Sequence, residues 1–328
     1  MKERVYWVDY LKAFAMFLVV LGHSGIDHGS ILKSWIYGFH MPLFVFMSGY
    51  FISSPRPIIK ELKKDFKTLV VPYLFFSLFL IPFYYVVQRL SGVHISSSMF
   101  TYISPRLLMD DYYHCGPIWF LGALLIIKVS FNSVQAVLQN GGGYKELSII
   151  LIIILVVVLD LFSGIHLCSA DSALLLFPYY VAGTLCPKIL RAFSRNSILI
   201  WGLIGMSGYT LLSFNNTGID YDQLKLGTNV VFTYIEGMLG CFSLAFLFSL
   251  LSNKKNEWLR DVGMNTLTIL GFHSIFIQVF RFAYKYAVSE VIPVWYLFII
   301  SIVSFVFCYL LSLVLSKWCP VAIGGMRK

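Results

Sequence analysis

The chain has 328 residues, of which 58% are hydrophobic and only 12% are charged. Soluble globular domains are usually about 25% charged, so this composition excludes an ordinary soluble protein and predicts an integral membrane protein. The formal net charge is +9, yet nothing in the sequence resembles a nucleic-acid-binding module, and no nucleic-acid partner is expected.

Ten apolar segments have roughly the 20 residues that a helix needs to cross about 30 Å of hydrocarbon. Pro82 and Pro178 lie inside two of them and Pro293 begins the last, which membrane helices tolerate where neighbours satisfy the freed carbonyls. The sequence therefore predicts an all-α integral membrane protein, with a single transmembrane domain over residues 1–328. The predicted spans are 7–26, 35–53, 68–88, 117–138, 146–164, 172–190, 197–214, 228–250, 264–283 and 293–315.

The first apolar segment has two interpretations. Lys2 and Arg4 precede it, as in a secretory signal peptide. Asp9 and Lys12 interrupt its apolar run, however, and no small-residue cleavage site follows. The first transmembrane span is the favoured interpretation.

Basic residues set the expected orientation. With a cytoplasmic N terminus, six of the 25 Lys and Arg residues fall outside and the other 19 fall inside. This bias follows the positive-inside rule and predicts that both termini are cytoplasmic. Much of the net charge then serves to anchor the chain at anionic membrane lipids. The six outer residues are Lys33, Arg89, Arg106, Lys225, Arg281 and Lys285.

The six cysteines include no C-x-x-C pair, so neither a zinc site nor a redox motif is expected, and no metal is predicted. Cys115 and Cys168 both fall near the predicted outer face. They either form a disulfide with each other or remain reduced, and the sequence leaves both alternatives open. The longest predicted connection, about 89–116, also lies outside and contains Asp110, Asp111 and His114.

Charged and titratable residues are rare inside apolar spans, because burying them in hydrocarbon costs a few kcal/mol or more. Eleven residues separate Lys12 from His23 in the first span, which amounts to three helical turns plus about 20° and a rise of about 16 Å. The two side chains are therefore expected on one helical face, with Asp9 on a neighbouring stripe, close enough to pair with Lys12. Either His23 is a general base or acid, or it is a packing histidine above a snorkelling lysine.

The second span and the basic run after it add to this pattern. His40 and Ser48 lie in an aromatic-rich segment, and Ser48 with Gly49 predicts close helix packing. Four lysines then recur at intervals of three and four residues, so they share a helical face that suits either lipid headgroups or the phosphates of a nucleotide. These lysines are Lys60, Lys63, Lys64 and Lys67.

Several segments together carry a family resemblance. They are the Lys12-x10-His23 spacing, "HMPLFVFMSGYF", the basic run ending in "VVPY", "GPIWFLGALL" and "VGMNTLTILGFHSIF". In this order they resemble the acyltransferase-3 family of membrane O-acyltransferases, and within it the branch with fucose 4-O-acetylase-like and polysaccharide O-acetyltransferases. The resemblance runs from the first predicted span to the ninth.

The resemblance implies an enzyme that transfers an acyl group, most commonly acetyl, from cytoplasmic acyl-CoA to a hydroxyl of a cell-surface sugar or polysaccharide, in the bacterial inner membrane. It also implies that Lys12 and His23 are essential. The family often has Arg at the first position, and Lys keeps the charge but loses bidentate recognition of phosphate. His23 is the expected base, and Lys12 with the four-lysine face is expected to bind CoA. Ser48, Trp119 and Asn265 are candidate oxyanion donors.

Two further polar residues lie inside predicted spans. His273 follows the "NTLTIL" segment, where a functional and a packing role are both open. Glu236 is an intramembrane carboxylate, for which a function is the default hypothesis; it is a candidate to orient His23, contact the sugar or neutralise Lys12. Together with His23 and Asp9 they form the predicted catalytic set.

Two other functions compete with the enzyme. A transporter or flippase for lipid-linked sugars would also carry a polar path through a bundle, usually with paired repeat halves, and no such repeats are apparent. A polysaccharide polymerase would be expected to have a long external loop rich in arginine, which is missing. The acceptor sugar, the acyl length and the oligomeric state are not readable from the sequence.

Overall fold

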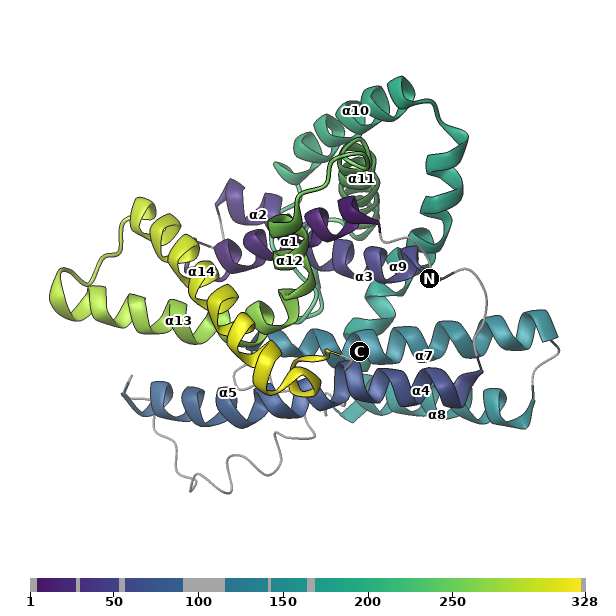
Figure 1. Cartoon of the computed structure of the whole chain (residues 1–328), viewed down its shortest axis with the longest axis horizontal. Helices are drawn as coiled ribbons and strands as arrows, with labels where there is room; N and C mark the ends of the chain where they lie inside the picture. Colours follow the sequence, from purple (N-terminus) through teal and green to yellow (C-terminus); the bar gives the residue numbers. More distant parts are fainter. Residues whose placement is uncertain are drawn as a thin grey trace. The chain divides into compact units, whose positions relative to one another are not determined.

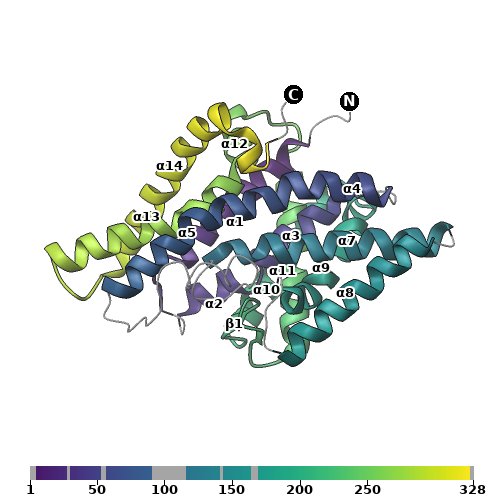
Figure 2. The same cartoon turned by 90° about the horizontal axis from the view of Figure 1, so that it is seen from below.

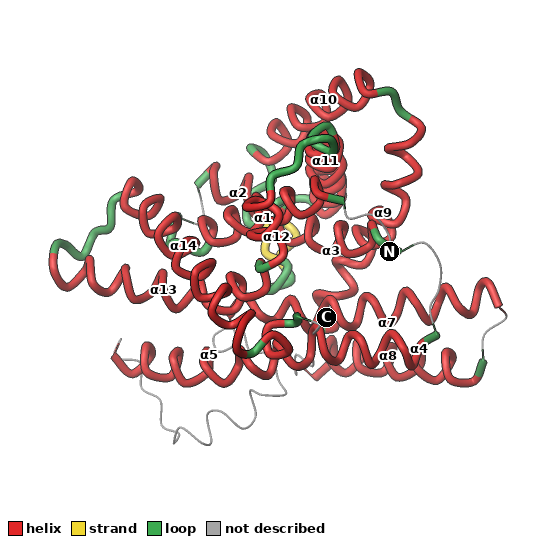
Figure 3. The backbone as a smooth tube through the Cα atoms, in the orientation of Figure 1, coloured by secondary structure: helices red, strands yellow, loops and turns green. Residues whose placement is uncertain are grey.

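The computed structural model describes residues 5–27, 30–52, 57–90, 116–140, 143–163 and 169–325. Helices dominate this part of the chain (Figure 1). Among the described residues, strands are limited to β1 (Ile219–Asp220) and β2 (Lys225–Leu226), a short antiparallel pair shown in yellow in Figure 3. The prediction of an all-α protein is confirmed apart from this small hairpin.

The described helices fall into two compact units, each assembled from separate stretches of sequence. The first unit contains α1 (Tyr6–Gly22), α2 (Ile31–Tyr37), α3 (His40–Tyr50), α10 (Arg195–Ser213), α11 (Val230–Ser249), α12 (Glu257–Met264) and α13 (Thr266–Ala287). The second contains α4 (Ile58–Asp65), the π-helix η1 (Phe66–Val70), α5 (Val71–Leu90), η2 (Gly116–Ile118), α7 (Trp119–Asn140), α8 (Tyr144–Ser163) and η3 (Pro320–Ile323). Two further helices, α9 (Ala170–Ala192) and α14 (Val294–Trp318), contribute residues to both units.

Each predicted apolar span contains helix. Within the described part of the chain, six helical stretches are long and apolar enough to cross a membrane. The number of spans and the sides of the termini remain predictions. Pro82 and Pro178 lie inside helices, and α14 starts directly after Pro293, as predicted. The six stretches are Ile58–Val87, Gly116–Leu138, Ala170–Ala192, Val230–Ser249, Thr266–Ala287 and Val294–Trp318.

In the first unit, α1 packs against α3, α11, α12 and α13. Its buried residues include Val8, Leu11 and Val20, which are almost fully shielded from solvent. At Gly263, the backbone of α12 comes so close to Asp9 of α1 that an added Cβ would lie 2.9 Å from the Asp9 Cα. In the same unit, α10 and α11 lie side by side (Figure 1).

The second predicted span consists of two helices rather than one. Between α2 and α3, Gly38 and Phe39 interrupt the helix, and Phe39 has φ −133°. In an unbroken helix, the ring of Pro42 would clash with the carbonyl of Gly38. Because α3 starts anew at His40, Pro42 occupies its first turn, where the missing N–H has no intrahelical partner to lose.

Glycines let α3 and α9 touch through their backbones. An added Cβ on Gly49 would lie 3.2 Å from the Tyr180 carbonyl carbon, and one on Gly183 would lie 2.8 Å from that of Phe46. The close helix packing predicted at Gly49 is therefore present. Small residues allow such contacts where helices pack inside a membrane.

Enlarging a glycine at this crossing is expected to destabilise the protein. Gly183→Ala should lower the melting temperature in detergent by several degrees, because overpacking usually costs about 1–3 kcal/mol. Gly208→Ala is the matched control: its Cβ would meet only the Leu239 Cδ1, at 3.7 Å. Equal melting temperatures for the two variants would contradict a backbone contact at Gly183.

In the second unit, α7 and α8 form a helical hairpin, and α4 and η1 pack on α7 (Figure 2). The π-helical turn of η1 precedes Pro72, which cannot donate a backbone hydrogen bond. Within the same stretch, the Thr68 hydroxyl donates to the Lys64 carbonyl oxygen at 3.1 Å. The π-helical turn thus accommodates the missing N–H of Pro72, and the Thr68 hydroxyl provides a hydrogen bond to the Lys64 carbonyl.

Candidate active site

His23 lies at the C-terminal end of α1. The helix ends at Gly22, four residues earlier than the predicted span, and His23 caps it with its backbone N–H donating to the Val19 carbonyl. The side chain is half-buried and its ring lies 5.2 Å from that of His273, centroid to centroid, with the two planes 63° apart. Two candidate residues 250 positions apart in the sequence are therefore brought together.

His273 is completely buried in α13. Its Nδ1 lies 2.9 Å from the Ile269 carbonyl oxygen and 3.0 Å from that of Leu270. Since both partners are acceptors, Nδ1 carries the proton and donates to them, which leaves Nε2 with a lone pair. Among the described residues, that buried Nε2 has no hydrogen-bond partner.

Tyr37 joins a third histidine to this pair. Its ring lies 6.2 Å from that of His23 and 4.6 Å from that of His40. His40 is buried, and its Nδ1 donates to the Ile36 carbonyl oxygen at 3.0 Å. The Lys33 ammonium lies over the Tyr37 ring at 5.0 Å from its centroid. The end of α1 is thus surrounded by imidazole, phenol and ammonium groups.

Lys12 lies near the opposite end of the same helix. Its side chain is half-buried, and its ammonium lies 5.6 Å from the centroid of the Phe51 ring, just beyond the end of α3. Asp9 is buried one turn earlier. In an uninterrupted helix the rise from Lys12 to His23 is about 16 Å. Because α1 is one unbroken helix from Lys12 to Gly22, it has the geometry on which the predicted separation of Lys12 and His23 was based.

Ser48 and Asn265, two predicted oxyanion donors, already have backbone partners. The Ser48 hydroxyl donates to the Phe44 carbonyl at 3.0 Å, and the Asn265 amide donates to that of Asp261 at 2.8 Å. The third candidate, Trp119, lies in the second unit. A role in binding an oxyanion would require Ser48 or Asn265 to exchange its present bond.

Glu236 belongs to a separate polar network. It is fully buried in α11, and its Oε2 accepts a hydrogen bond from the Asn216 amide at 2.9 Å. The carboxylate lies against Gly38, where an added Cβ would meet Oε1. Asn216 also donates to the Thr233 hydroxyl at 2.9 Å. Within the described part of the chain, Glu236 hydrogen-bonds no histidine; its carboxylate instead contacts the α2–α3 break at Gly38.

The predicted lysine face lies in the second unit. Lys60 and Lys63 in α4 and Lys67 in η1 are exposed. Lys64 is half-exposed, and its ammonium lies 3.3 Å from a Glu61 carboxylate oxygen. The π-helical register of η1 departs from the regular α-helical spacing that was predicted to carry Lys67.

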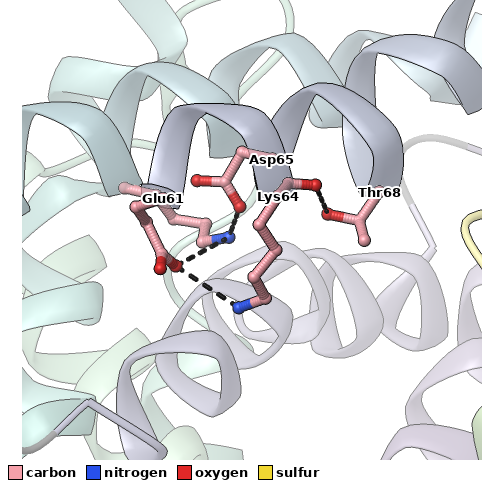
Figure 4. Close-up of polar contacts among 5 residues, drawn as sticks. Glu61, Lys64, Asp65 and Thr68 are labelled. Carbon is pink, nitrogen blue, oxygen red and sulfur yellow. Dashed lines mark hydrogen bonds and ion pairs between the residues drawn. The ribbon is translucent and has the colours of Figure 1, made fainter. Parts of the chain in front are cut away.

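A buried ion-pair cluster, missed by the sequence analysis, lies behind this face (Figure 4). Lys128 of α7 pairs with Asp65 and lies 3.9 Å from a Glu61 oxygen. Asp65 is fully buried, and Glu61 and Lys128 are largely so. The positive-inside count placed Lys128 among the inner cations. The available signals were its position in the middle of the predicted span 117–138 and the i, i+4 spacing of Glu61 and Asp65.

Several predicted features lie outside the described residues. They are Asp110, Asp111 and His114 of the long connection, and Cys115 and Cys168, whose pairing was left open. The described free cysteines are Cys186, Cys241, Cys308 and Cys319.

The apolar helices define a multi-pass membrane protein, and polar side chains gather within its helical interior. The family model for an acyltransferase domain, acyltransferase-3, matches residues 5–313. The chain therefore belongs to the acyltransferase-3 family, and acyl transfer is its general chemistry. No significant match is found among curated proteins or among solved structures.

Proposed function

We propose that this protein is an acyl-CoA-dependent O-acyltransferase that moves an acyl group, most readily acetyl, onto a hydroxyl of a cell-surface sugar or polysaccharide precursor. The proposal places it in the bacterial inner membrane. The observation that carries it is the pairing of His23 with His273 inside a chain of the acyltransferase-3 family. A sugar is proposed as the acceptor because the sequence resembles the fucose 4-O-acetylase-like branch of the family.

His23 is the proposed general base. It is half-buried, so a substrate hydroxyl can reach it, whereas His273 is completely enclosed. His23 removes the hydroxyl proton as the sugar oxygen forms a bond to the thioester carbonyl carbon. The C–S bond then breaks, and the protonated imidazole returns its proton to the CoA thiolate.

His273 is the proposed positioning residue for that step. Its two backbone acceptors fix the tautomer with a lone pair on Nε2. Because the two rings are neighbours, we propose that this lone pair accepts a hydrogen bond from His23 once His23 holds the substrate proton, which favours the protonated form.

Lys12 is proposed to attract the CoA phosphates at the cytoplasmic end of α1. In the second unit, the exposed Lys60, Lys63 and Lys67 are proposed as a separate surface that attracts phosphates. The helix then spans the distance from the phosphates to the reactive thioester. Asp9 neighbours Lys12 and is proposed to adjust its position, and Glu236 is proposed to act through Gly38.

The proposed function is tested by incubating the purified protein in vesicles with radiolabelled acetyl-CoA and a panel of sugar acceptors. Label on a sugar supports the proposal. If no label is transferred while a lipid-linked sugar crosses the bilayer, the transporter hypothesis replaces it.

Lys12→Gln is expected to raise the KM for acetyl-CoA by about 10- to 100-fold, because a charge-assisted contact is lost. The kcat should change much less, since Lys12 lies about 16 Å from the proposed base. Lys12→Arg keeps the charge and serves as the control. Equal KM values for Lys12→Gln and Lys12→Arg would contradict a phosphate-binding role.

A further inference from the structure

A second cationic group lies beside the histidine pair. Arg281 of α13 is half-buried, and its guanidinium lies against Gly25, two residues after His23. An added Cβ on Gly25 would lie 2.8 Å from the Arg281 Cζ. Gly25 has φ +104°, a conformation that residues with a side chain rarely adopt. Glycine at this position therefore serves both the turn after α1 and the approach of the guanidinium.

One buried nitrogen of this guanidinium lacks a partner within the described structure. Among the described residues, Arg281 forms no ion pair or hydrogen bond, and its Nε is buried without a partner. A polar group buried without a partner is costly, and for a charged group the cost is larger. An oxyanion of a ligand would supply such a partner.

Lys33 adds a second positive charge to the same region. It is 6% exposed, and its ammonium covers Tyr37, whose ring also neighbours His23. Burial lowers the pKa of Lys33. The carboxylates of Asp220 and Asp27 raise this pKa, and the positive charge of Arg281 lowers it. The charge of Arg281 therefore acts on Lys33, and the carboxylates of Asp220 and Asp27 offset part of the positive charge there.

Membrane anchoring does not explain these two cations. Both belong to the minority of basic residues predicted on the outer side, whereas the positive-inside rule accounts for an excess of Lys and Arg only on the cytoplasmic side. The outer side is also where the sugar acceptor is proposed to enter. A ligand that meets Arg281 there has its other groups close to His23, since two residues of extended chain reach about 7 Å.

We propose that Arg281, assisted by Lys33, forms a subsite for a carboxylate or phosphate on the acceptor, so that the protein acylates an acidic sugar or a sugar phosphate. The inference rests on the proposed function and specifies its acceptor class. An arginine fork binds such planar or tetrahedral oxyanions in a bidentate manner. A carboxylate held there would leave a hydroxyl of the same ring facing His23.

The test compares three acceptors that differ in charge: a methyl glucoside, the matching methyl glucuronide and glucose 1-phosphate. The wild type is expected to show a higher kcat/KM for at least one anionic acceptor than for the neutral one. Arg281→Gln should lower that anionic-to-neutral ratio by about 10- to 100-fold, as expected for the loss of a hydrogen bond to a charged group. Arg281→Lys should fall in between.

Lys285→Gln is the matched control, because it removes an exposed cation one turn further along α13. Its anionic-to-neutral ratio should equal that of the wild type. A wild type without charge preference, or an Arg281→Gln variant that keeps it, would overturn the subsite while leaving the acyltransferase intact.

A binding measurement separates the two proposals. Glucuronide or glucose 1-phosphate should raise the melting temperature of the wild type and of Lys285→Gln more than methyl glucoside does, and Arg281→Lys should show a smaller rise. This shift requires no acyl transfer. If the anions raise the melting temperature more but no acyl group is transferred, the anion subsite is retained and the enzyme is rejected. If acyl groups are transferred but the anions raise the melting temperature no more than methyl glucoside does, the enzyme is retained and the anion subsite is rejected.

Discussion

Replacing His23 with Ala is expected to lower kcat for acyl transfer by about 10²- to 10⁴-fold, the usual contribution of a general base. The KM for acetyl-CoA should stay close to that of the wild type, because Lys12, the proposed phosphate contact, lies at the other end of α1. The measurement is steady-state transfer of radiolabelled acetyl groups in vesicles.

Two further variants make this result specific. His40→Gln changes another histidine beside Tyr37 and should cost much less activity, since that ring is buried and bonded to the Ile36 carbonyl. His273→Gln should lower kcat and shift the pH at which the rate rises, because it alters the group next to the base. Full activity in His23→Ala would remove His23 from the chemistry altogether.

Replacing Lys128 with Met is expected to destabilise the protein by about 3–5 kcal/mol, the usual cost of removing one member of a buried ion pair. The variant leaves the carboxylates of Asp65 and Glu61 buried without their shared cation (Figure 4). Thermal unfolding in detergent, followed by circular dichroism, would measure the loss as a lowered melting temperature.

Lys64→Gln is the matched control for this experiment. Lys64 also pairs with Glu61, but its side chain is 38% exposed. Exposed pairs contribute about 0–1 kcal/mol, so this variant should melt close to the wild type. The double variant Asp65→Leu with Lys128→Met should recover much of the stability, because apolar residues can replace a buried pair at little cost. Similar melting temperatures for Lys64→Gln and Lys128→Met would show that burial does not distinguish the pairs.

Much of the helical architecture could be predicted from the sequence, because apolar runs of membrane length leave few other structures for the backbone. Each predicted span contains helix. The break at Gly38 and Phe39 was not predicted, although Pro42 carried its signal: a proline in a continuous helix clashes with the carbonyl four residues earlier. The end of α1 at Gly22 was also placed too late, although His23, Ser24 and Gly25 already interrupt the apolar run there.

The candidate site was predictable where it depends on one helix. The positions of Lys12 and His23 follow from helical geometry within α1. The contact between His23 and His273 depends on how α1 packs against α13, which a single sequence does not specify. Arg281 was counted only as an outer charge, and its approach to Gly25 required a three-dimensional arrangement.

The uninterrupted course of α1 has a mechanical consequence. No proline and no break in hydrogen bonding lies between Lys12 and Gly22, so this stretch has no built-in hinge. A rod of this kind transmits axial motion with little loss. A pull on the ammonium of Lys12 that shifts its backbone would shift His23 against His273 by a similar amount. Occupancy at Lys12 would then be felt as strain at the histidine pair.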